Sequence, residues 1–600
     1  MRRLLSFRSL AASTATVCVS LVVARASAEE PPASVTGEYS PYEQASIDEA
    51  LGTRKMQLDD APEGKTVEGI DVVSLDVIEK RDPAPRFLNV FHTTTKPYVI
   101  EREVLLRVGG PYTQVLADET ARNLRDLIQL SVVLVVPVRG STKDKVRILV
   151  VTKDVWSLRL NSNVRYVSGK LEYLYLQPSE WNIAGTHHQA FAQLVYQPLS
   201  YALGGGYSIP RLLGSRVLVG ASANVIINSK QGKPEGSYGT FSLGQPLFSS
   251  LTEWSWGVVG SWTNEVTRRY SNGELALFDA RSTPAIDAIP DEIRSVLAIG
   301  SASVTRSFGW AVKNDVSLGL EASRRKYTTD DLSRFDPVAA SEFRARRLPV
   351  DDTRINPYVE YHGYTSRFLR VLDLETLGLQ EDFRLGHDLW LKGYPVTTAL
   401  GSTRSFMGVG TGAQYAVLLG DGLARGGIEA LFEGDKDALA DVVVEGRERV
   451  ITPRLGFGRL LFDGQQVFRP RDSLNRRSTL GGEGRLRGYP TSYLVGKNLV
   501  AYSLEFRTAP VEILSCQLGA AFFWDTGDAY DDRSELSLKH SVGAGLRMLF
   551  PQLDRYVLRF DFGFPVGRRP ADVSPMQFVI TFEQAFPMPA LRRGTVFTTR

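Results

Sequence analysis

Apolar and polar residues alternate with a period of two through most of the chain after residue 157. The apolar faces of four such runs are Leu158, Leu160, Val164 and Tyr166; Val500, Tyr502, Leu504 and Phe506; Tyr556, Leu558, Phe560, Phe562 and Phe564; and Phe578, Ile580, Phe582 and Phe586. Charged residues such as Arg159, Glu505 and Asp561 occupy the alternate positions. Because successive side chains of a strand point to opposite faces, each run predicts a strand with one apolar and one polar face.

The length of these runs favours a membrane barrel over a soluble β-sandwich. Sandwich strands usually have about 5 to 6 residues, whereas membrane strands need about 9 to 11, and the runs here fit the longer value. Closure of a barrel also pairs every backbone amide that lipid cannot satisfy. We therefore expect residues 158–586 to form an all-β transmembrane barrel. At roughly 27 residues per strand and connection, it would have about 16 antiparallel strands. Polar stretches near 263–292 and 324–354 are expected to be extracellular loops.

A mixed α/β pattern precedes the alternating region. Residues 66–157 contain, in order, an extended run, two helical stretches and two strands rich in Val and Ile. These elements are Val67–Ile78, Tyr98–Arg107, Gln114–Leu127, Ser131–Val138 and Lys145–Val155. Gly109-Gly110-Pro111 separates the helices, and Gly140-Ser141 separates the last two strands. The order predicts one βααββ domain.

The N-terminal residues predict export. Residues 1–28 combine a basic start, a short apolar run and the small residues Ala26-Ser27-Ala28, which is typical of a secretory signal cleaved before Glu29. The alternative, a membrane anchor, is less favoured because the apolar run is shorter than the about 20 residues of a spanning helix. Residues 29–65 are rich in Pro, Ser, Glu and Asp and predict a flexible linker, with one short helix around Glu43–Leu51.

Composition argues against several classes of function. The 600 residues include 70 Lys+Arg, 67 Asp+Glu, two cysteines and six histidines. Loss of the signal removes four arginines and no acid, which leaves a formal charge of −1 and no basic field for nucleic acid. So few Cys and His residues disfavour a metal site, and we expect no cofactor.

Catalysis is not expected either. The chain has no G-x-S-x-G turn, and the one histidine pair, His187-His188, occupies neighbouring positions whose side chains would point to opposite faces of a strand.

One segment near the C-terminus carries a candidate motif. The stretch Gly481–Pro490 has five Gly and Pro residues in ten, which by itself predicts a flexible surface loop. It contains Leu486, Arg487, Gly488 and Tyr489. A strand with Glu505 follows, and then a strand in which Phe523, Asp525 and Gly527 share one face.

This ordered set resembles the BamA/TamA-type outer-membrane assembly factors, whose superfamily includes two-partner secretion transporters and bacterial surface antigens. The resemblance implies that Arg487 folds into the barrel lumen, where Glu505 and Asp525 hold it, beside the inner-wall residues Phe523 and Gly527. It also implies that the last strand, with Phe578, Ile580, Phe582 and a terminal aromatic at Phe586, is a signal for the protein's own insertion. Carboxylates can grip a guanidinium bidentately, so such a bond would hold the loop in place.

The mixed region is similar to a polypeptide-transport-associated (POTRA) domain, through Tyr98–Glu103, Gly109–Tyr112 and Asn123-Leu124. The resemblance implies a POTRA domain in the periplasm at residues 66–157. Residues 587–600 extend beyond the last strand, which Pro587 and Pro589 should stop.

The resulting expectation is a non-enzymatic insertion or translocation factor in the outer membrane of a Gram-negative-type bacterium. The POTRA domain would capture client polypeptide and pass it to the barrel. The alternatives are a two-partner-type secretion transporter and a passive outer-membrane pore. Expected partners are outer-membrane lipids and unfolded client polypeptides, with periplasmic chaperones or accessory lipoproteins as further candidates.

Overall fold

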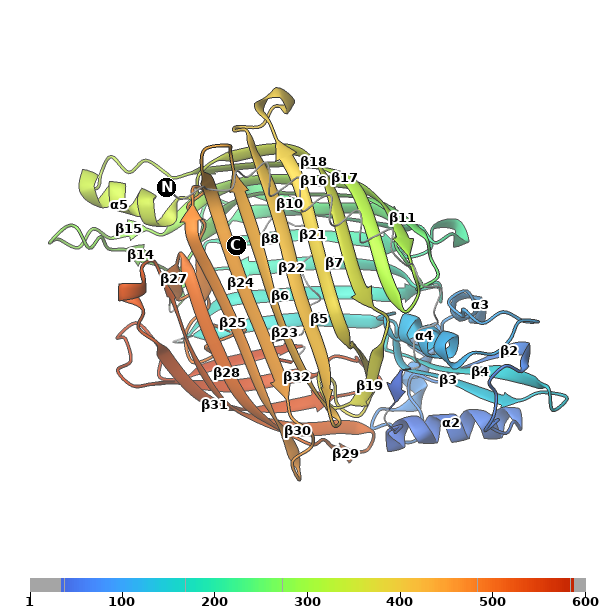
Figure 1. Ribbon diagram of the computed structural model, residues 1–600. Coiled ribbons are helices and arrows are strands. Elements are labelled where there is room, and N and C mark those ends of the chain that lie inside the picture. The colour runs from blue at the N-terminus through green and yellow to red at the C-terminus, as the bar shows by residue number, and fades with distance from the viewer. Residues whose placement is uncertain are drawn as a thin grey trace.

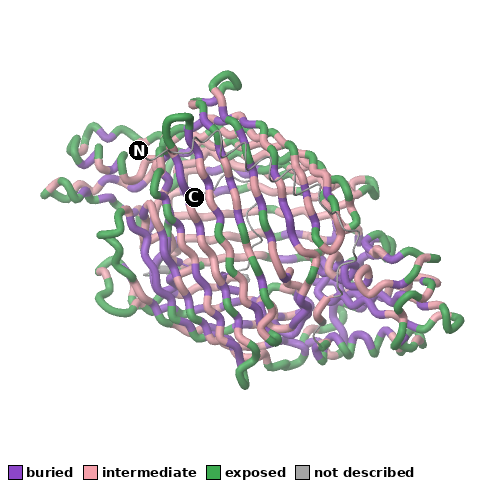
Figure 2. The backbone as a smooth tube through the Cα atoms, in the orientation of Figure 1, coloured by how far each residue is buried: buried purple, intermediate pink, exposed green. Residues whose placement is uncertain are grey.

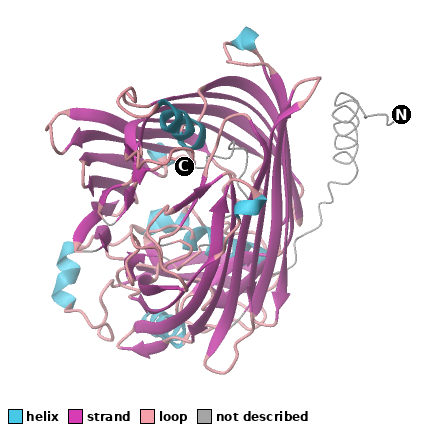
Figure 3. Cartoon of the chain, turned by 90° about the vertical axis from the view of Figure 1, so that its left-hand side faces the viewer, coloured by secondary structure: helices cyan, strands magenta, loops and turns pink. Residues whose placement is uncertain are grey.

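The dominant element of the protein is a closed barrel of antiparallel strands (Figure 1, Figure 3). The structure, a computed structural model, describes residues 34–586 except 37, 168, 272, 483 and 583. The barrel strands are β5 (Leu158–Val167), β6 (Lys170–Ile183), β7 (His188–Gln197), β8 (Ser200–Ile209), β9 (Leu218–Asn228), β10 (Pro234–Gln245), β11 (Trp254–Arg268), β16 (Glu292–Phe308), β17 (Val312–Thr328), β18 (Asp352–Thr365), β21 (Gly386–Val396), β22 (Phe406–Leu419), β23 (Gly422–Gly434), β24 (Leu439–Ile451), β25 (Gly458–Asp472), β28 (Asn498–Thr508), β29 (Val511–Ile513), β30 (Cys516–Tyr530), β31 (Lys539–Leu549), β32 (Leu558–Val566) and β33 (Gln577–Phe582). The expected signal at 1–28 and the extension at 587–600 lie outside the described residues.

The barrel has 20 strands in the described chain, counting β28 and β29 as one strand interrupted at Ala509-Pro510. Proline lacks the amide that would continue the ladder. The expected number of about 16 strands is wrong because the connections are shorter than assumed. Two residues join β7 to β8 and β22 to β23, and three join β16 to β17. Each strand therefore uses fewer residues than the roughly 27 that the estimate allowed.

The two ends of the barrel carry different structures (Figure 1). The N-terminal helices and the small sheet lie at one end, here called the domain end. The opposite, loop end carries α5 (Pro337–Arg347) and the short hairpins β12–β13 (Tyr270–Ser271, Glu274–Leu275) and β14–β15 (Leu277–Phe278, Ile289–Pro290). These elements belong to the two connections expected as loops, 263–292 and 324–354. β11 extends into the first range as far as Arg268, and β17 extends into the second as far as Thr328.

The alternation in sequence becomes an apolar outer wall and a polar lumen. On β32, Arg559 and Asp561 are buried on the inner face, whereas Phe562 and Phe564 are exposed on the outer face. Figure 2 shows buried positions concentrated in the C-terminal strands and at the junction with the N-terminal elements. The lumen is therefore filled mainly along the C-terminal side of the barrel.

The side-chain directions on β16 and β17 predict that two arginine substitutions differ greatly in their effect on stability. Leu320 is exposed on the outer face, and Ser301 lies inward, opposite the lumen acid Glu321. We expect Leu320→Arg to lower the free energy of unfolding in lipid vesicles by about 2 to 4 kcal/mol, because a charge near mid-membrane is poorly solvated. Ser301→Arg should cost far less, since Glu321 can pair with it. Equal losses in urea titrations of the two variants would contradict the assigned faces.

A three-stranded sheet covered by helices on both faces forms the N-terminal domain. Its strands β2 (Thr66–Leu75), β4 (Lys145–Asp154) and β3 (Leu130–Arg139) lie in that order, with β2 parallel and β3 antiparallel to β4. The helices α3 (Pro97–Glu101) and α4 (Gln114–Arg125) pack on one face, and the 3-10 helix η1 (Arg86–Phe91) precedes them. The observed order is βααββ, although α3 ends well before the expected Arg107. No helix in the described residues is long and apolar enough to span a membrane.

The segment expected to be a linker contributes a helix to this domain. α2 (Pro41–Arg54) begins with a capping box in which Ser40 and Glu43 exchange side-chain-to-backbone hydrogen bonds. Its buried residues Tyr42, Ile47 and Ala50 pack against β3 and β4. α2 contains the short helix expected around Glu43–Leu51, but the expectation of a flexible linker is wrong over this helix. Three apolar residues on one side are enough to dock a polar helix once a sheet face is available.

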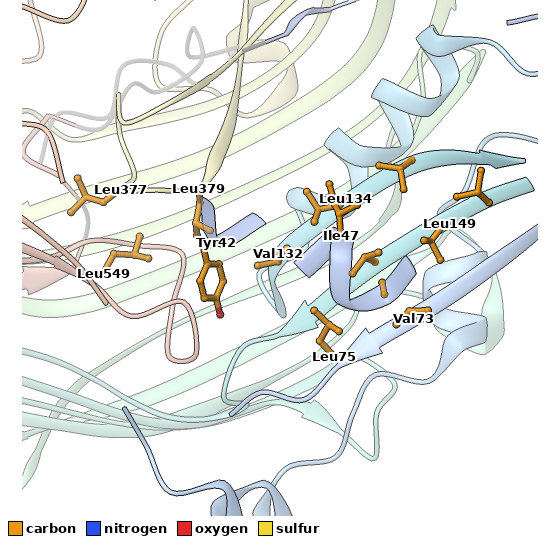
Figure 4. Close-up of a cluster of buried hydrophobic side chains, with 14 of the residues drawn as sticks. Tyr42, Ile47, Val73, Leu75, Val132, Leu134, Leu149, Leu377, Leu379 and Leu549 are labelled. Carbon is orange, nitrogen blue, oxygen red and sulfur yellow. The ribbon is translucent and has the colours of Figure 1, made fainter. Parts of the chain in front are cut away.

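An inserted hairpin connects the domain to the barrel. Between β18 and β21, the strands β19 (Phe368–Leu372) and β20 (Gln380–Arg384) form a small sheet with β1 (Val35–Thr36). Figure 4 shows Leu377 and Leu379, from the tip of this hairpin, beside Tyr42 of α2. Leu549 of β31 belongs to the same apolar cluster. The core of the domain thus continues into the domain end of the barrel.

Candidate functional site

The candidate site is the loop between β25 and β28, which leaves the barrel wall and enters the lumen. It is enclosed by β26 (Ser478–Leu480) and β27 (Leu494–Gly496), which pair with each other. Gly481 and Gly482 both have positive φ, at 119° and 94°. At Gly488, a Cβ atom would lie 2.9 Å from the Phe564 carbonyl carbon, so the loop can approach β32 only with glycine there. The glycines therefore allow a tight turn inside the barrel. The flexible surface loop that the Gly-rich sequence also suggested is not found among the described residues.

Arg487 at the tip of this loop is 1% exposed and contacts three carboxylates. Its Nε and Nη2 donate to the two oxygens of Asp525, each at 2.9 Å. Nη1 donates to Glu505 Oε2 at 2.7 Å and to Asp561 Oδ2 at 3.3 Å. The structure thus brings Arg487, Glu505 and Asp525 together and adds Asp561. Sequence reasoning missed Asp561 as a partner, although it stands on the polar face of the alternating run 556–564.

Three further arginines share these acids. Arg507 Nε donates to Glu505 Oε1 at 2.7 Å, and Arg547 and Arg559 donate to Asp561 at 2.6 and 2.9 Å. All of these side chains are buried, so the ion pairs form one network across the inner faces of β28, β30, β31 and β32. Removal of a single member of this network would be costly, because the buried charges that remain would be poorly solvated.

The shared face of Phe523, Asp525 and Gly527 on β30 serves three different contacts. The Phe523 ring lies 3.4 Å below the guanidinium carbon of Arg487, a cation–π contact. Asp525 provides the ion pair. At Gly527, a Cβ atom would lie 2.8 Å from Leu480 Cδ2, so glycine allows β26 to lie against the wall.

Leu486 and Tyr489 attach the loop to a different part of the barrel. Both are buried in an apolar cluster with residues of β21, β23, β24 and β25, namely Tyr394, Val396, Leu431, Val443 and Val467. The loop thus packs against strands on both sides of its own entry point, and the ion pairs and the apolar cluster together determine its position.

The C-terminal residues differ from the expected terminal strand. β33 ends at Phe582, and Phe586 lies in the lumen, 4% exposed, rather than on the outer face. Its ring is 5.1 Å from the guanidinium carbon of Arg487 and 4.9 Å from that of Arg485, and its carbonyl oxygen accepts a hydrogen bond from Arg449. A strand-end aromatic is drawn inward here because three lumen arginines surround it. The Phe582 side chain lies outside the described residues.

The other two residues expected in the terminal signal do lie on β33. Phe578 stacks on Phe562 of β32 with ring centroids 4.8 Å apart. Ile580 is paired with Val164 of β5, where the barrel closes.

A second polar cluster, which sequence reasoning missed, lies where the N-terminal domain meets the barrel. His92 contacts Ser157 Oγ through Nδ1 at 3.3 Å and Asp154 Oδ2 through Nε2 at 3.0 Å. A Ser/His/Asp set is therefore present, although no motif predicted it. Asp154 also accepts hydrogen bonds from Thr95 and from Asn182 of β6. Because Ser157 and Asp154 are both buried, this cluster joins the domain to the barrel rather than presenting a hydroxyl to solvent.

His187 extends this cluster and predicts a pH dependence. The turn residue contacts Thr95 Oγ1 through Nε2 at 3.0 Å, and burial lowers its pKa to about 4, although the nearby Asp154 acts in the opposite direction. Between pH 6.5 and 4 the unfolded chain binds a proton that the folded chain does not, so stability falls as the pH falls through this range. We expect a loss of up to about 3 kcal/mol from this residue.

The measurement is urea unfolding at pH 7 and at pH 4. His187→Gln should reduce the loss of unfolding free energy between pH 7 and pH 4. The control His188→Gln, at the neighbouring position, should leave that loss unchanged. An unaltered pH dependence in His187→Gln would contradict the assignment.

Comparisons with known proteins find one family model and several solved structures. Residues 472–586 match the model of the Omp85 superfamily domain. Among solved structures, BamA from Haemophilus ducreyi lacking POTRA domains 1-3 is 12% identical, with 91% of this chain and 94% of that chain covered and a TM-score of 0.35. CdiB from Acinetobacter baumannii is 11% identical, with 93% and 92% covered and a TM-score of 0.40. CdiB from Escherichia coli is 11% identical, with 88% and 80% covered and a TM-score of 0.42. No curated protein matches the chain.

The matched segment begins at the end of β25 and contains the arginine loop, its three acids and the last strand. Through this segment, the C-terminal part of the barrel is similar to the Omp85 superfamily domain.

Proposed function

We propose that the protein inserts or translocates polypeptides at a Gram-negative outer membrane, with the N-terminal domain acting as a periplasmic POTRA domain. The match of residues 472–586 to the Omp85 superfamily domain supports insertion or translocation in general. The seam where the barrel closes points to the particular route.

The observation that carries the proposal is the weak pairing of β33 with β5. Only Ile580 and Val164 are paired across this junction in the described chain. By contrast, β32 and β33 pair over six residues, and β5 and β6 over ten. Unpaired backbone groups at a strand edge are a template for another strand. The seam is therefore the place in the wall where a client strand could add with the least disruption.

The arginine loop supports this mechanism by its position. It binds β28, β30 and β32 but makes no ion pair with β33 or β5 among the described residues. The loop thus holds β32, the neighbour of the seam strand β33, while the seam itself is left weak.

The N-terminal domain offers an edge for capture. β2 is an outer strand of its sheet, and no described strand pairs with its free edge from Ile70 to Leu75. An extended client could add there and then pass to the barrel, whose domain end lies next to the sheet (Figure 1).

A secretion transporter is a second candidate, because part of the lumen is open. Thr240 of β10 and Val259 of β11 belong to the inner face, yet both are exposed. The arginine loop contacts β21, β23, β24, β25, β28, β30 and β32 instead, so an extended chain could cross along β10 and β11.

A disulfide across the seam tests the proposal and separates the two candidates. In a Cys516→Ser background, Val164→Cys with Ile580→Cys should abolish client insertion when oxidised and restore it when reduced. The control pair Leu546→Cys with Phe560→Cys joins β31 to β32, a junction that is already fully paired, and should not affect insertion. Full insertion through the locked seam would refute the seam route. Continued export of a secreted client through the locked barrel would favour the secretion transporter.

A further inference from the structure

The outer wall of the barrel contains a hollow that the seam mechanism does not use. Its volume is about 520 Å³, within the roughly 300–1,000 Å³ of small-molecule sites. It crosses β10, β11, β16, β17 and β18 and is mostly apolar. The floor is a row of small residues, Gly260, Gly300 and Ala322, which are cross-strand neighbours. Large side chains are missing from three adjacent strands at one level, which creates the depression.

The strand register shows that this hollow faces lipid. Tyr238 of β10 accepts a hydrogen bond from Gln193 across the inner face, so Phe241 points outward. Phe241 is paired with Gly260, and Ile355 with Ala322, so both belong to the same outer row as the floor. Phe241 and Trp262 are 42% and 39% exposed, which is expected for aromatic side chains that contact acyl chains.

Two unpaired basic residues stand at the loop-end side of the hollow. Arg324 lines it, and Lys326 follows two positions later on the same face of β17, about 7 Å further along the strand. Both are exposed, and neither forms an ion pair or donates a hydrogen bond to another described residue. The acids at the loop ends of β10 and β16, Glu235 and Glu292, are both held by Arg268. The positive charge beside the hollow is therefore available to a ligand.

We propose that this hollow binds a phosphorylated glycolipid of the outer leaflet. One acyl chain lies over Gly260, Gly300 and Ala322, between Phe241 and Ile355. A phosphate group of the same lipid is held by Arg324 and Lys326. The loop end faces the outer leaflet because the N-terminal domain occupies the opposite, periplasmic end in the proposed function.

Two features select this ligand over an ordinary annular lipid. The depression gives an acyl chain contacts on its floor and sides, whereas a flat wall contacts it on one side only. Two cations spaced along one strand suit a headgroup that carries phosphate, and each adds about 1 kcal/mol of attraction near a charged membrane surface. The site thus binds both the acyl chain and the phosphate group of the lipid.

Binding to the folded protein in detergent micelles tests the proposal by native mass spectrometry. The probe is a bis-phosphorylated, multiply acylated glucosamine disaccharide, compared with its dephosphorylated form and with phosphatidylglycerol. Arg324→Ala with Lys326→Ala should weaken binding of the phosphorylated probe by about 10- to 30-fold and leave the dephosphorylated form unchanged. Arg324→Lys with Lys326→Arg keeps both charges and should retain binding.

A second variant tests the hollow itself. Gly300→Leu fills the floor, and its Cβ would meet no atom closer than 3.9 Å, so the barrel should fold normally. It should weaken binding of both glycolipid forms, whereas Ala302→Leu, one row nearer the domain end, should not. Wild-type binding by both Gly300→Leu and the double alanine variant would overturn the proposal, and so would tighter binding of phosphatidylglycerol than of the glycolipid. Because none of these variants touches the seam, client insertion can be scored separately.

Discussion

Replacement of Arg487 by alanine is expected to lower the free energy of unfolding of the barrel by about 3 to 5 kcal/mol, because it leaves buried carboxylates without their central cation. Glu505 and Asp561 keep partners in Arg507, Arg547 and Arg559, but Asp525 loses its bidentate contact. The loop also loses its contact with Phe523. We expect the barrel still to reach the membrane but to insert clients poorly.

Urea unfolding in vesicles and an assay of client insertion measure the two effects. Arg487→Lys is the matched control: it keeps the charge but not the planar fork, so it should fall between wild type and alanine in both assays. Wild-type stability together with wild-type client levels in Arg487→Ala would remove the loop from the mechanism.

The second large effect is expected at Lys153, which joins the N-terminal domain to the barrel. Its ammonium is fully buried and contacts Tyr42 Oη at 2.8 Å, Glu79 Oε2 at 3.0 Å and Asp82 Oδ2 at 2.8 Å. The other oxygen of Asp82 accepts hydrogen bonds from Ser515 and Gln552 at the domain end of the barrel. Lys153→Met leaves Asp82 without its ion-pair partner, while Glu79 keeps Arg81. We expect the free energy of unfolding to fall by about 3 to 5 kcal/mol and the domain to be released.

Hydrogen exchange of β4 and limited proteolysis near residue 157 would detect this release. Lys143→Met, in the exposed turn between β3 and β4, is the control and should change neither. Adding Asp82→Asn to Lys153→Met should restore part of the stability, because one uncompensated charge is then removed. No difference between the Lys153 and Lys143 variants would show that the buried pair does not hold the domain.

The same contacts bear on how a client would pass from domain to barrel. Besides the Lys153 cluster, Arg125 of α4 pairs with Asp382 of β20 at 2.6 Å, and Arg370 of β19 pairs with Asp118 of α4 at 3.0 Å. The domain is thus attached both to the wall and to the inserted hairpin. A client bound along β2 would therefore be held at a constant distance from the domain end of the barrel.

Local pattern was sufficient to predict several features. Period-two alternation assigned Arg559 and Asp561 to the lumen and Phe562 and Phe564 to lipid, as the structure has them. It could do so because the direction of a side chain depends only on its position along one strand. The resemblance of the motif around Arg487 to the BamA/TamA-type factors likewise implied Glu505 and Asp525 as its partners, and both contact Arg487.

What the sequence by itself determined is therefore the type of wall and the residues of the loop that enters it. Only the tertiary structure decided the number of strands, the docking of α2, the inward turn of Phe586 and the third acid, Asp561. Each of these depends on contacts between residues far apart in the chain. The closure of the barrel sets those contacts through strand register and connection length. Neither can be inferred from the periodic pattern of apolar residues in the sequence.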